Sequence, residues 1–290
     1  MKIQTMSIVC GTTACNSMCP YCVSRTTPSA KLTTEVNWKN LDIACRLAER
    51  GGATTCLITG KGEPTLYPDL ILSYLSRIKK YFPLIELQTN VIKIGDGSLD
   101  RIVPSHDLIQ GVSYLGQWRQ SGLTTIAISA VSHIREQNQT IYGLNYPELA
   151  PVCDKLHKLG YSIRLSIIMT KGRIDNVETM LKLVEETKKM GIEQLTIRSV
   201  HAPENGSGKE VEWIRENQVS VDSIRDFLET YASPVLHLPH GATVYDFGGQ
   251  NICLTNCLTT NETSENIRQV IFTPGGGIFY DWKYAGARLL

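Results

Sequence analysis

Three cysteines near the start of the chain are the strongest chemical signal in the sequence. Cys15, Cys19 and Cys22 are spaced as CxxxCxxC. Thiolates so close together can converge on one soft metal centre such as an iron–sulfur cluster. Structural zinc is the alternative, but it normally takes four ligands, often from two separated pairs, and no fourth cysteine or histidine lies nearby. The spacing therefore favours an iron–sulfur cluster.

A second motif, Gly60-Lys61-Gly62-Glu63-Pro64, follows the next expected strand. Glycines allow a backbone to approach a ligand closely, and a carboxylate can accept hydrogen bonds from an ammonium group. By itself such a segment is an ordinary strand-to-helix turn. It comes one strand–helix unit after the cysteines, so the two motifs support each other.

Together these motifs resemble the signature of the radical SAM superfamily, with Tyr21 as the aromatic residue before the last cysteine. The resemblance implies a [4Fe-4S] cluster held by the three cysteines, with one iron left to bind S-adenosylmethionine. Reductive cleavage of S-adenosylmethionine then gives a 5′-deoxyadenosyl radical, which abstracts hydrogen from a substrate. Gly60, Gly62 and Glu63 match the GxGEP form of the family motif that binds the amino group of S-adenosylmethionine; Lys61 departs from its commoner GGEP form.

The resemblance continues more weakly to about residue 200. It implies further cofactor-binding roles for residues at or near the carboxyl ends of later strands, where the sites of parallel barrels lie. With the aromatic residue of the cysteine motif, these are Tyr21, Asn90, Ser129, Lys171 and Arg198. For each of the four strand-end residues, a capped or solvated loop residue is the alternative interpretation.

Alternating strands and helices must position these residues. The strand candidates, several of them near-continuous apolar runs typical of parallel strands covered on both faces, are Thr5–Cys10, Thr54–Thr59, Ile85–Thr89, Thr124–Ala130, Ser162–Met169 and Gln194–Val200. Apolar residues at helical spacing, each set followed by glycine, predict helices over Asn37–Arg50, Pro147–Leu159 and Asn176–Met190. We predict an α/β fold, a partial (β/α)6 TIM-like barrel with a C-terminal capping extension.

The change in composition after Val200 predicts a division of the chain into a barrel, residues 1–205, and an extension covering the barrel mouth, residues 206–290. The extension is expected to contain a helix over Asp222–Ala232. A hairpin is expected from Ile267–Thr273 and Ile278–Trp282, around a proline and three glycines.

Cys253 and Cys257 in this extension are further candidates. The tail resembles that of the molybdenum-cofactor GTP cyclase branch, in which three cysteines hold a second cluster. This chain has no cysteine after Cys257 and lacks the paired-glycine end of that branch, which argues against that cyclase. Three interpretations stay open: ligands of a second iron–sulfur cluster, helped by Asp281, His240 or substrate; a catalytic thiol; or buried core cysteines.

The other cysteines and several polar tail residues receive simpler assignments. Cys10, Cys45, Cys56 and Cys153 fall on expected strands or apolar helix faces and are assigned to the core. Four residues are candidates for lining a substrate pocket, with solvated loop positions as the alternative: His237, His240, Tyr245 and Asp246.

Composition restricts the class of partner. A net charge of +1 gives no strong nucleic-acid signal, and no apolar run approaches the roughly 18 residues of a membrane span. No secretory segment is recognised, and nine cysteines without a disulfide pattern favour the cytoplasm. The short tail favours a small-molecule or nucleotide substrate, with flavodoxin or ferredoxin as electron donor. The alternatives are a peptide- or protein-modifying enzyme of the same superfamily and a non-catalytic iron–sulfur or zinc-binding protein.

Overall fold

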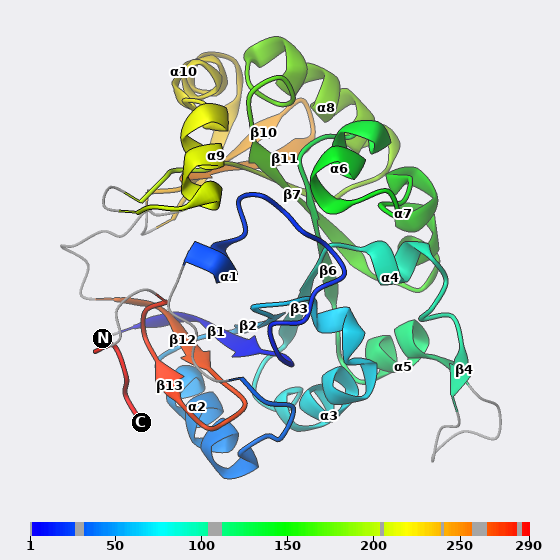
Figure 1. The fold of residues 1–290 in the computed structure, drawn as a ribbon, viewed down its shortest axis with the longest axis vertical. Helices are drawn as coiled ribbons and strands as arrows, with labels where there is room; N and C mark the ends of the chain where they lie inside the picture. Colours follow the sequence, from blue (N-terminus) through cyan, green and yellow to red (C-terminus); the bar gives the residue numbers. More distant parts are fainter. Residues whose placement is uncertain are drawn as a thin grey trace.

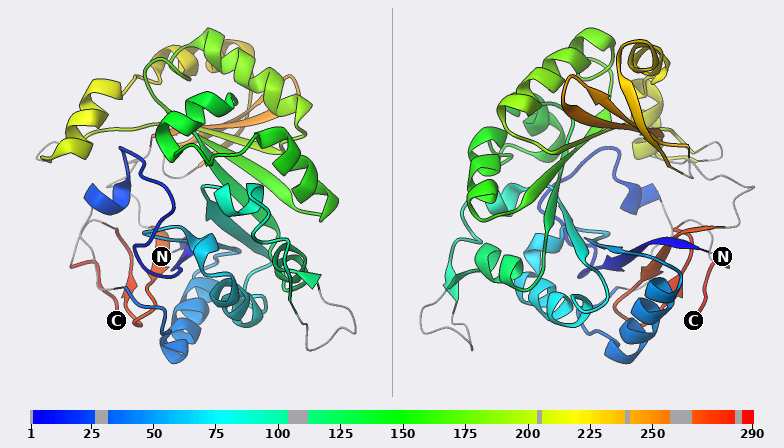
Figure 2. Two further views of the ribbon diagram at one scale, coloured as in Figure 1. Left: turned by 45° about the vertical axis from the view of Figure 1, so that its right-hand side comes forward. Right: turned by 180° about the vertical axis from the view of Figure 1, so that it is seen from behind.

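The computed structural model describes most of the chain: residues 2–26, 32–103, 112–203, 206–238, 241–256, 266–282 and 286–290. These residues form one large sheet that curls into an open arc, with helices on its outer side (Figure 1). The views from other directions show the same arrangement, a curved sheet inside and helices outside (Figure 2).

The large sheet has eleven strands in the order β13-β12-β1-β2-β3-β6-β7-β8-β11-β10-β9. Strands β12 to β11 in this order pair in parallel, and antiparallel pairs occur only toward the two edges. The bounds are β1 Ile3–Val9, β2 Thr55–Thr59, β3 Leu84–Thr89, β6 Thr125–Ala130, β7 Ser162–Met169, β8 Gln194–Ser199, β9 Ser233–His237, β10 Thr243–Phe247, β11 Gln250–Asn256, β12 Ile267–Phe272 and β13 Ile278–Phe279. A separate small pair consists of β4 Ile102–Val103 and β5 Val112–Ser113.

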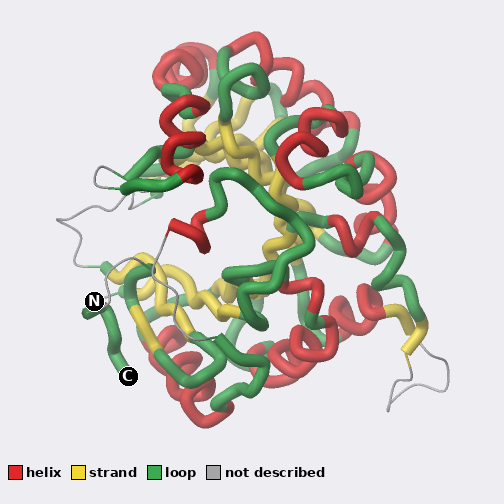
Figure 3. Tube along the Cα trace, in the orientation of Figure 1, coloured by secondary structure: helices red, strands yellow, loops and turns green. Residues whose placement is uncertain are grey.

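Helices follow most of the parallel strands and surround the sheet (Figure 3). Their bounds are α1 Val23–Thr26, α2 Trp38–Arg50, the 3-10 turn η1 Pro64–Leu66, α3 Pro68–Ile78, α4 Ile92–Gly95, α5 Tyr114–Gln120, α6 Arg135–Tyr142, α7 Leu149–Lys158, α8 Val177–Lys189, α9 Lys209–Asn217 and α10 Asp222–Tyr231. The six expected strands and three expected helices are all present, which confirms the partial, unclosed barrel.

The main helices begin where side chains can satisfy their free amides. The Asn37 side chain accepts from the Asn40 amide at the start of α2, and Gly52 follows that helix with φ +93°. Asn176 and Thr179 form a reciprocal capping box at the start of α8. Such caps stabilise a helix end by about 1 kcal/mol each, and they fix the points at which the chain returns to the sheet.

The core lies between the helices and the outer face of the sheet, and the inner face is polar. In β7, Ile163, Leu165 and Ile167 are completely buried toward the helices, while Arg164 and Ser166 occupy the alternate positions. The expectation of strands apolar on both faces is therefore wrong for β7 and for its neighbour β8. Their side chains alternate because only one face packs against helices.

The C-terminal segment adds strands to both edges of the sheet. Strand β11 pairs in parallel with β8, and β12 pairs in parallel with β1, while β12 and β13 form the expected hairpin. These strands complete sheet edges that would otherwise be exposed, and the expectation that the extension covers the barrel mouth stays a prediction. Helix α9 of this segment lies beside α1, which follows the cysteines (Figure 1). The division at residue 205 stays a prediction.

Candidate functional site

The segment after β1 carries the three cysteines across the space that the sheet encloses (Figure 1). Cys15 is exposed, and Cys19 and Cys22 are half-buried. The Cys22 amide donates to the Cys19 carbonyl at 3.2 Å, which makes a tight turn leading into α1. The Ser17 hydroxyl lies 3.2 Å from the Cys19 sulfur. The turn therefore brings the last two cysteines together at the carboxyl end of a parallel strand.

The thiols share one electrostatic environment. Burial raises the pKa of Cys19 to about 11, the Ser17 hydroxyl lowers it in part, and Cys22 and Cys15 raise it further. Burial likewise raises the pKa of Cys15. Among the described residues, no three cysteine, histidine or acidic side chains already surround a point where a single metal ion could bind. A bound cation would favour the thiolate forms of Cys15 and Cys19.

The glycine motif after β2 packs directly against the cysteine segment. The Glu63 amide donates to the Ala14 carbonyl at 2.9 Å. A Cβ added at Gly62 would lie only 2.0 Å from the oxygen of the same carbonyl. A glycine is therefore required for the two segments to touch. The same backbone contact that brings them together leaves no room for a side chain.

Glu63 is a buried carboxylate that links β2 to the end of β3. One of its oxygens accepts from the Thr65 amide at 3.0 Å, the Thr65 hydroxyl at 2.6 Å and the Thr89 hydroxyl at 2.7 Å. The other accepts from the Asn90 amide at 2.9 Å. Burial raises the pKa of Glu63 and these hydrogen bonds lower it. The second oxygen retains lone-pair capacity for a further donor.

Asn90 connects the end of β3 to the cysteine segment. Its side-chain nitrogen, Nδ2, donates to the Asn16 side-chain oxygen at 2.7 Å and lies 3.9 Å from the Cys15 sulfur. Its side-chain oxygen accepts from the Ile92 amide at 3.1 Å. The structure thus brings together Cys15, Glu63 and Asn90, which the sequence places on three different segments.

Tyr21 is held by aromatic side chains from both halves of the chain. Its hydroxyl lies 2.7 Å from the Tyr142 hydroxyl, and its ring centroid lies 5.7 Å from that of Trp213 in α9. The Tyr142 ring packs at a tilt of 32° against the Tyr146 ring, with 5.0 Å between the ring centroids. The Tyr146 hydroxyl donates to the Ser129 carbonyl. Burial raises the pKa of both Tyr21 and Tyr142, so both hydroxyls stay protonated.

Replacing Tyr21 with phenylalanine is expected to lower the free energy of unfolding by about 1–2 kcal/mol, because the buried Tyr142 hydroxyl loses its partner. Denaturant titration followed by circular dichroism measures this change. Tyr231→Phe is the matched control: Tyr231 is 68% exposed, and its removal should change stability by less than about 0.5 kcal/mol. Equal effects of the two substitutions would contradict this role of Tyr21.

Lys171 lies on the exposed turn after β7, beside Arg173 in a shallow cavity that α6 also lines. The guanidinium of Arg173 donates to the hydroxyls of Thr170 and Thr140. Ser129 is half-buried at the end of β6, where its backbone carbonyl accepts a hydrogen bond from the Tyr146 hydroxyl. Contacts of Lys171 or Ser129 with a cofactor stay predictions.

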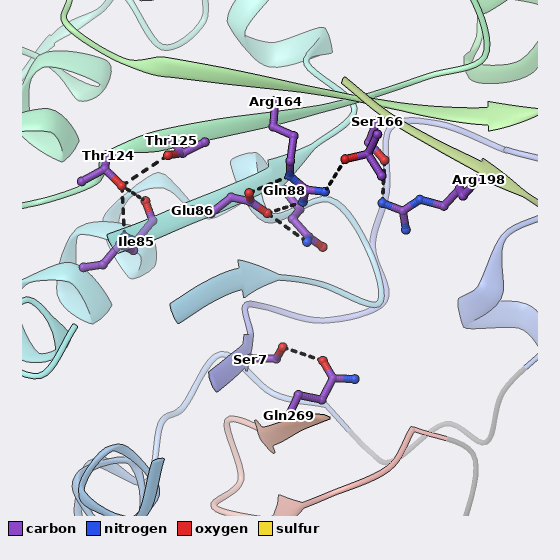
Figure 4. A network of polar contacts seen from close by, with 11 residues as sticks. Ser7, Ile85, Glu86, Gln88, Thr124, Thr125, Arg164, Ser166, Arg198 and Gln269 are labelled. Carbon is purple, nitrogen blue, oxygen red and sulfur yellow. Dashed lines mark hydrogen bonds and ion pairs between the residues drawn. The ribbon is translucent and has the colours of Figure 1, made fainter. Parts of the chain in front are cut away.

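A polar network lines the inner face of the sheet (Figure 4). Arg164 on β7 forms a paired hydrogen-bonded ion pair with Glu86 on β3; Glu86 is buried and Arg164 is half-buried. Ser7 on β1 donates to Gln269 on β12 at 3.0 Å. Arg198 donates to the Ser166 hydroxyl at 2.7 Å. Of these residues, only Arg198 was a sequence-based candidate; the alternation of polar residues along β7 was the available signal.

The tail candidates are separated by the structure. Cys253 lies half-buried on β11, where burial raises its thiol pKa and Arg164, Arg198 and Arg268 oppose the rise. Tyr245 packs against the apolar core and also lines a cavity between α10, β10 and β11, so its expected place in a substrate pocket stays a prediction.

The roles of the remaining tail candidates also stay predictions. Asp246 is exposed and accepts from the Gly249 amide in the turn that follows, and His237 lies on the exposed strand β9. Cys257 and His240 lie outside the described residues.

Comparison with known families assigns the chain. The family model described as the Radical SAM superfamily matches residues 9–187, which is more than half of the chain. The protein therefore belongs to the radical SAM superfamily. No curated protein sequence matches it. No described helix has both the length and the apolar character that a membrane crossing requires.

Solved structures of radical SAM enzymes resemble this fold. Streptococcus suis SuiB bound to S-adenosylmethionine matches with a TM-score of 0.60 and 14% identity, over 97% of this chain and 60% of SuiB. SuiB bound to the precursor peptide SuiA matches with a TM-score of 0.60 and 13% identity, over 97% of this chain and 60% of SuiB. HydG, a maturase of the [FeFe]-hydrogenase, matches with a TM-score of 0.52 and 13% identity, over 78% of this chain and 48% of HydG. The likeness concerns the fold, and this chain spans about 60% of the length of SuiB.

Proposed function

We propose that this member of the radical SAM superfamily cleaves S-adenosylmethionine at a [4Fe-4S] cluster held by Cys15, Cys19 and Cys22, and acts on a small molecule or nucleotide. When bound and reduced, such a cluster supplies the electron that cleaves S-adenosylmethionine to methionine and a 5′-deoxyadenosyl radical, which abstracts hydrogen from the substrate. The observation that carries the proposal is the direct packing of the glycine motif on the cysteine segment.

The donor set fits a four-iron cluster. Three thiols lie on one turn-rich segment at the carboxyl end of β1, and Ser17 is placed to donate a hydrogen bond to the Cys19 sulfur. Hydrogen bonds to cluster sulfurs tune the reduction potential of such centres. Because only three cysteines are supplied, one iron is left for a small-molecule ligand.

Glu63 is proposed to receive the ammonium group of S-adenosylmethionine on the oxygen that accepts only from the Asn90 amide. The other oxygen is occupied by Thr65 and Thr89, so the carboxylate is fixed before the ligand arrives. A preorganised buried carboxylate binds an ammonium group more strongly than a mobile exposed one. Asn90 holds the same region against Asn16 of the cysteine segment.

Other proposed roles follow from position. Tyr21 and Trp213 pack against each other beside the cysteines and limit the access of water to them. Gly60, Ser129 and Lys171 lie at or after strand ends, where the rest of S-adenosylmethionine would extend. The expected electron donor is flavodoxin or ferredoxin, and a reducing compartment, the cytoplasm, suits the free thiols.

Peptide modification is the second candidate, because the fold resembles SuiB, which has been solved with a precursor peptide. In that version Cys253 and Cys257 would help to hold a second cluster. Iron analysis helps to separate the two candidate functions. About four irons per chain favour an enzyme with a single cluster, and about eight favour a peptide-modifying enzyme with an auxiliary cluster.

The test is anaerobic. The cluster is reconstituted, dithionite and S-adenosylmethionine are added, and 5′-deoxyadenosine is measured by mass spectrometry. We expect 5′-deoxyadenosine together with methionine in equal amounts. A protein that is fully loaded with iron and binds S-adenosylmethionine, yet forms no 5′-deoxyadenosine with the reductant, would favour a non-catalytic iron–sulfur protein and overturn the proposal.

A further inference from the structure

The inner wall formed by β7, β8 and β11 has an unusual set of side chains. Ser166, Thr196 and Cys253 are register partners on the three strands, and Arg198 and Thr255 are partners in the next row. Register partners in parallel strands carry their side chains on the same face. Hydroxyls, a thiol and a guanidinium therefore line one continuous patch of the enclosed space.

The two arginines of this wall differ in their charge balance. Arg164 is neutralised by Glu86 through a paired contact. Within the described parts of the chain the Arg198 side chain has no acidic partner, and its only side-chain hydrogen bond goes to the Ser166 hydroxyl. Its Nε is buried and has no partner among the described residues. Arg198 as a whole is half-buried, and a guanidinium partly withdrawn from water without a counter-charge favours a bound anion.

The field around Cys253 agrees with this inference. Arg164, Arg198 and Arg268 all act to lower the pKa of the Cys253 thiol, against the effect of burial. The charge of Arg198 is therefore felt at Cys253 on the neighbouring strand. Glu86 is the acidic residue of the inner network, and it is already committed to Arg164.

The surrounding inner face is uncharged but polar. Ser7 and Gln269 contact each other across β1 and β12, and Gln88 donates to Glu86 from β3 (Figure 4). Hydroxyl and amide groups of this kind match the hydrogen-bonding groups of a polar metabolite better than an aliphatic chain.

We propose that Arg198 binds an oxyanion of the substrate, a carboxylate or a phosphate, so that the substrate is a small polar acid lying against β8 and β11. The inference rests on the proposed function. The family resemblance instead implies that Arg198 binds the cofactor, S-adenosylmethionine. However, the guanidinium bonds Ser166, which lies two residues before Ile168, the partner of Arg198 on β7. It thus reaches back from the strand ends toward the interior, and its planar fork suits an oxyanion.

The test uses protection of Cys253 in the cluster-loaded enzyme with S-adenosylmethionine bound. The rate of Cys253 modification by N-ethylmaleimide, a neutral reagent, is followed by peptide mass spectrometry. Inorganic phosphate and acetate are the probes, added separately. We expect one of them to slow modification of the wild-type enzyme; protection by phosphate indicates a phosphorylated substrate and protection by acetate a carboxylic acid.

Substitutions of Arg198 show whether the protection of Cys253 by the anion depends on this side chain. In Arg198→Gln the concentration of phosphate or acetate that halves the rate of Cys253 modification should rise about tenfold or more, because a charge-assisted hydrogen bond is lost. Arg198→Lys should restore part of the protection. Arg46→Gln, which removes the same charge from an exposed position on α2, should match the wild type.

Two results would overturn the inference. One is no protection of the wild type by either anion, or equal protection of Arg198→Gln. The other is a loss of S-adenosylmethionine binding by Arg198→Gln, which would assign the side chain to the cofactor. Wild-type 5′-deoxyadenosine formation, measured on the same preparation, shows separately whether the proposed function holds.

Discussion

Cys19→Ala is expected to abolish S-adenosylmethionine cleavage, lowering the rate of 5′-deoxyadenosine formation about a thousandfold or more, equivalent to about 4 kcal/mol of transition-state stabilisation. Cys19 is the middle cysteine of the segment, it is half-buried, and its sulfur lies 3.2 Å from the Ser17 hydroxyl. Two remaining thiols cannot hold a four-iron cluster firmly. Iron content, the visible absorption of the cluster and 5′-deoxyadenosine should therefore fall together.

Cys153→Ala serves as the matched control. Cys153 is buried on α7 and belongs to the apolar core, so its removal should lower stability by about 1 kcal/mol and leave iron content unchanged. Full iron loading and undiminished 5′-deoxyadenosine formation in Cys19→Ala would refute the ligand assignment. Retained iron without cleavage would instead show that Cys19 is needed for the reaction rather than for assembly of the cluster.

Short-range patterns allowed much of the fold to be predicted. The spacing of the cysteines and the glycines that end α2, α7 and α8 can be seen within a few neighbouring residues. The six strands of the barrel followed from their β-branched and apolar runs. Cys10, Cys45, Cys56 and Cys153 are buried, which confirms their assignment to the core.

Features that depend on distant pairing could not be predicted in the same way. Strand β9, Ser233–His237, is exposed along its whole length and begins with Ser-Pro, so no burial pattern marks it. The inner ion pair joins Arg164 to Glu86, which are 78 residues apart. The fixing of Glu63 by Thr89 and the Asn90 amide depends on how β2 lies beside β3. These contacts arise from sheet order, which a single sequence does not specify.

The role of Gly62 combines both kinds of information and gives a prediction with a large effect. The sequence marks it as part of a turn, but only the structure shows the reason for a glycine. The Ala14 carbonyl oxygen lies 2.0 Å from where its Cβ would be, and the adjacent Glu63 amide donates to that same carbonyl. Both groups are backbone, so neither can rotate away as a side chain could.

Gly62→Ala is therefore expected to push the cysteine segment away from Glu63, costing about 3 kcal/mol or more of stability. The altered segment should take up less iron on reconstitution and bind S-adenosylmethionine at least tenfold more weakly. Thermal unfolding, iron analysis and equilibrium binding measure the three effects.

Gly275→Ala is the control, because a Cβ there would meet no atom within 4 Å and stability should change by less than about 0.5 kcal/mol. If Gly62→Ala loaded iron and bound S-adenosylmethionine like Gly275→Ala, the contact with Ala14 would not be what joins the two motifs. Their proximity would then follow from the parallel pairing of β1 with β2 alone.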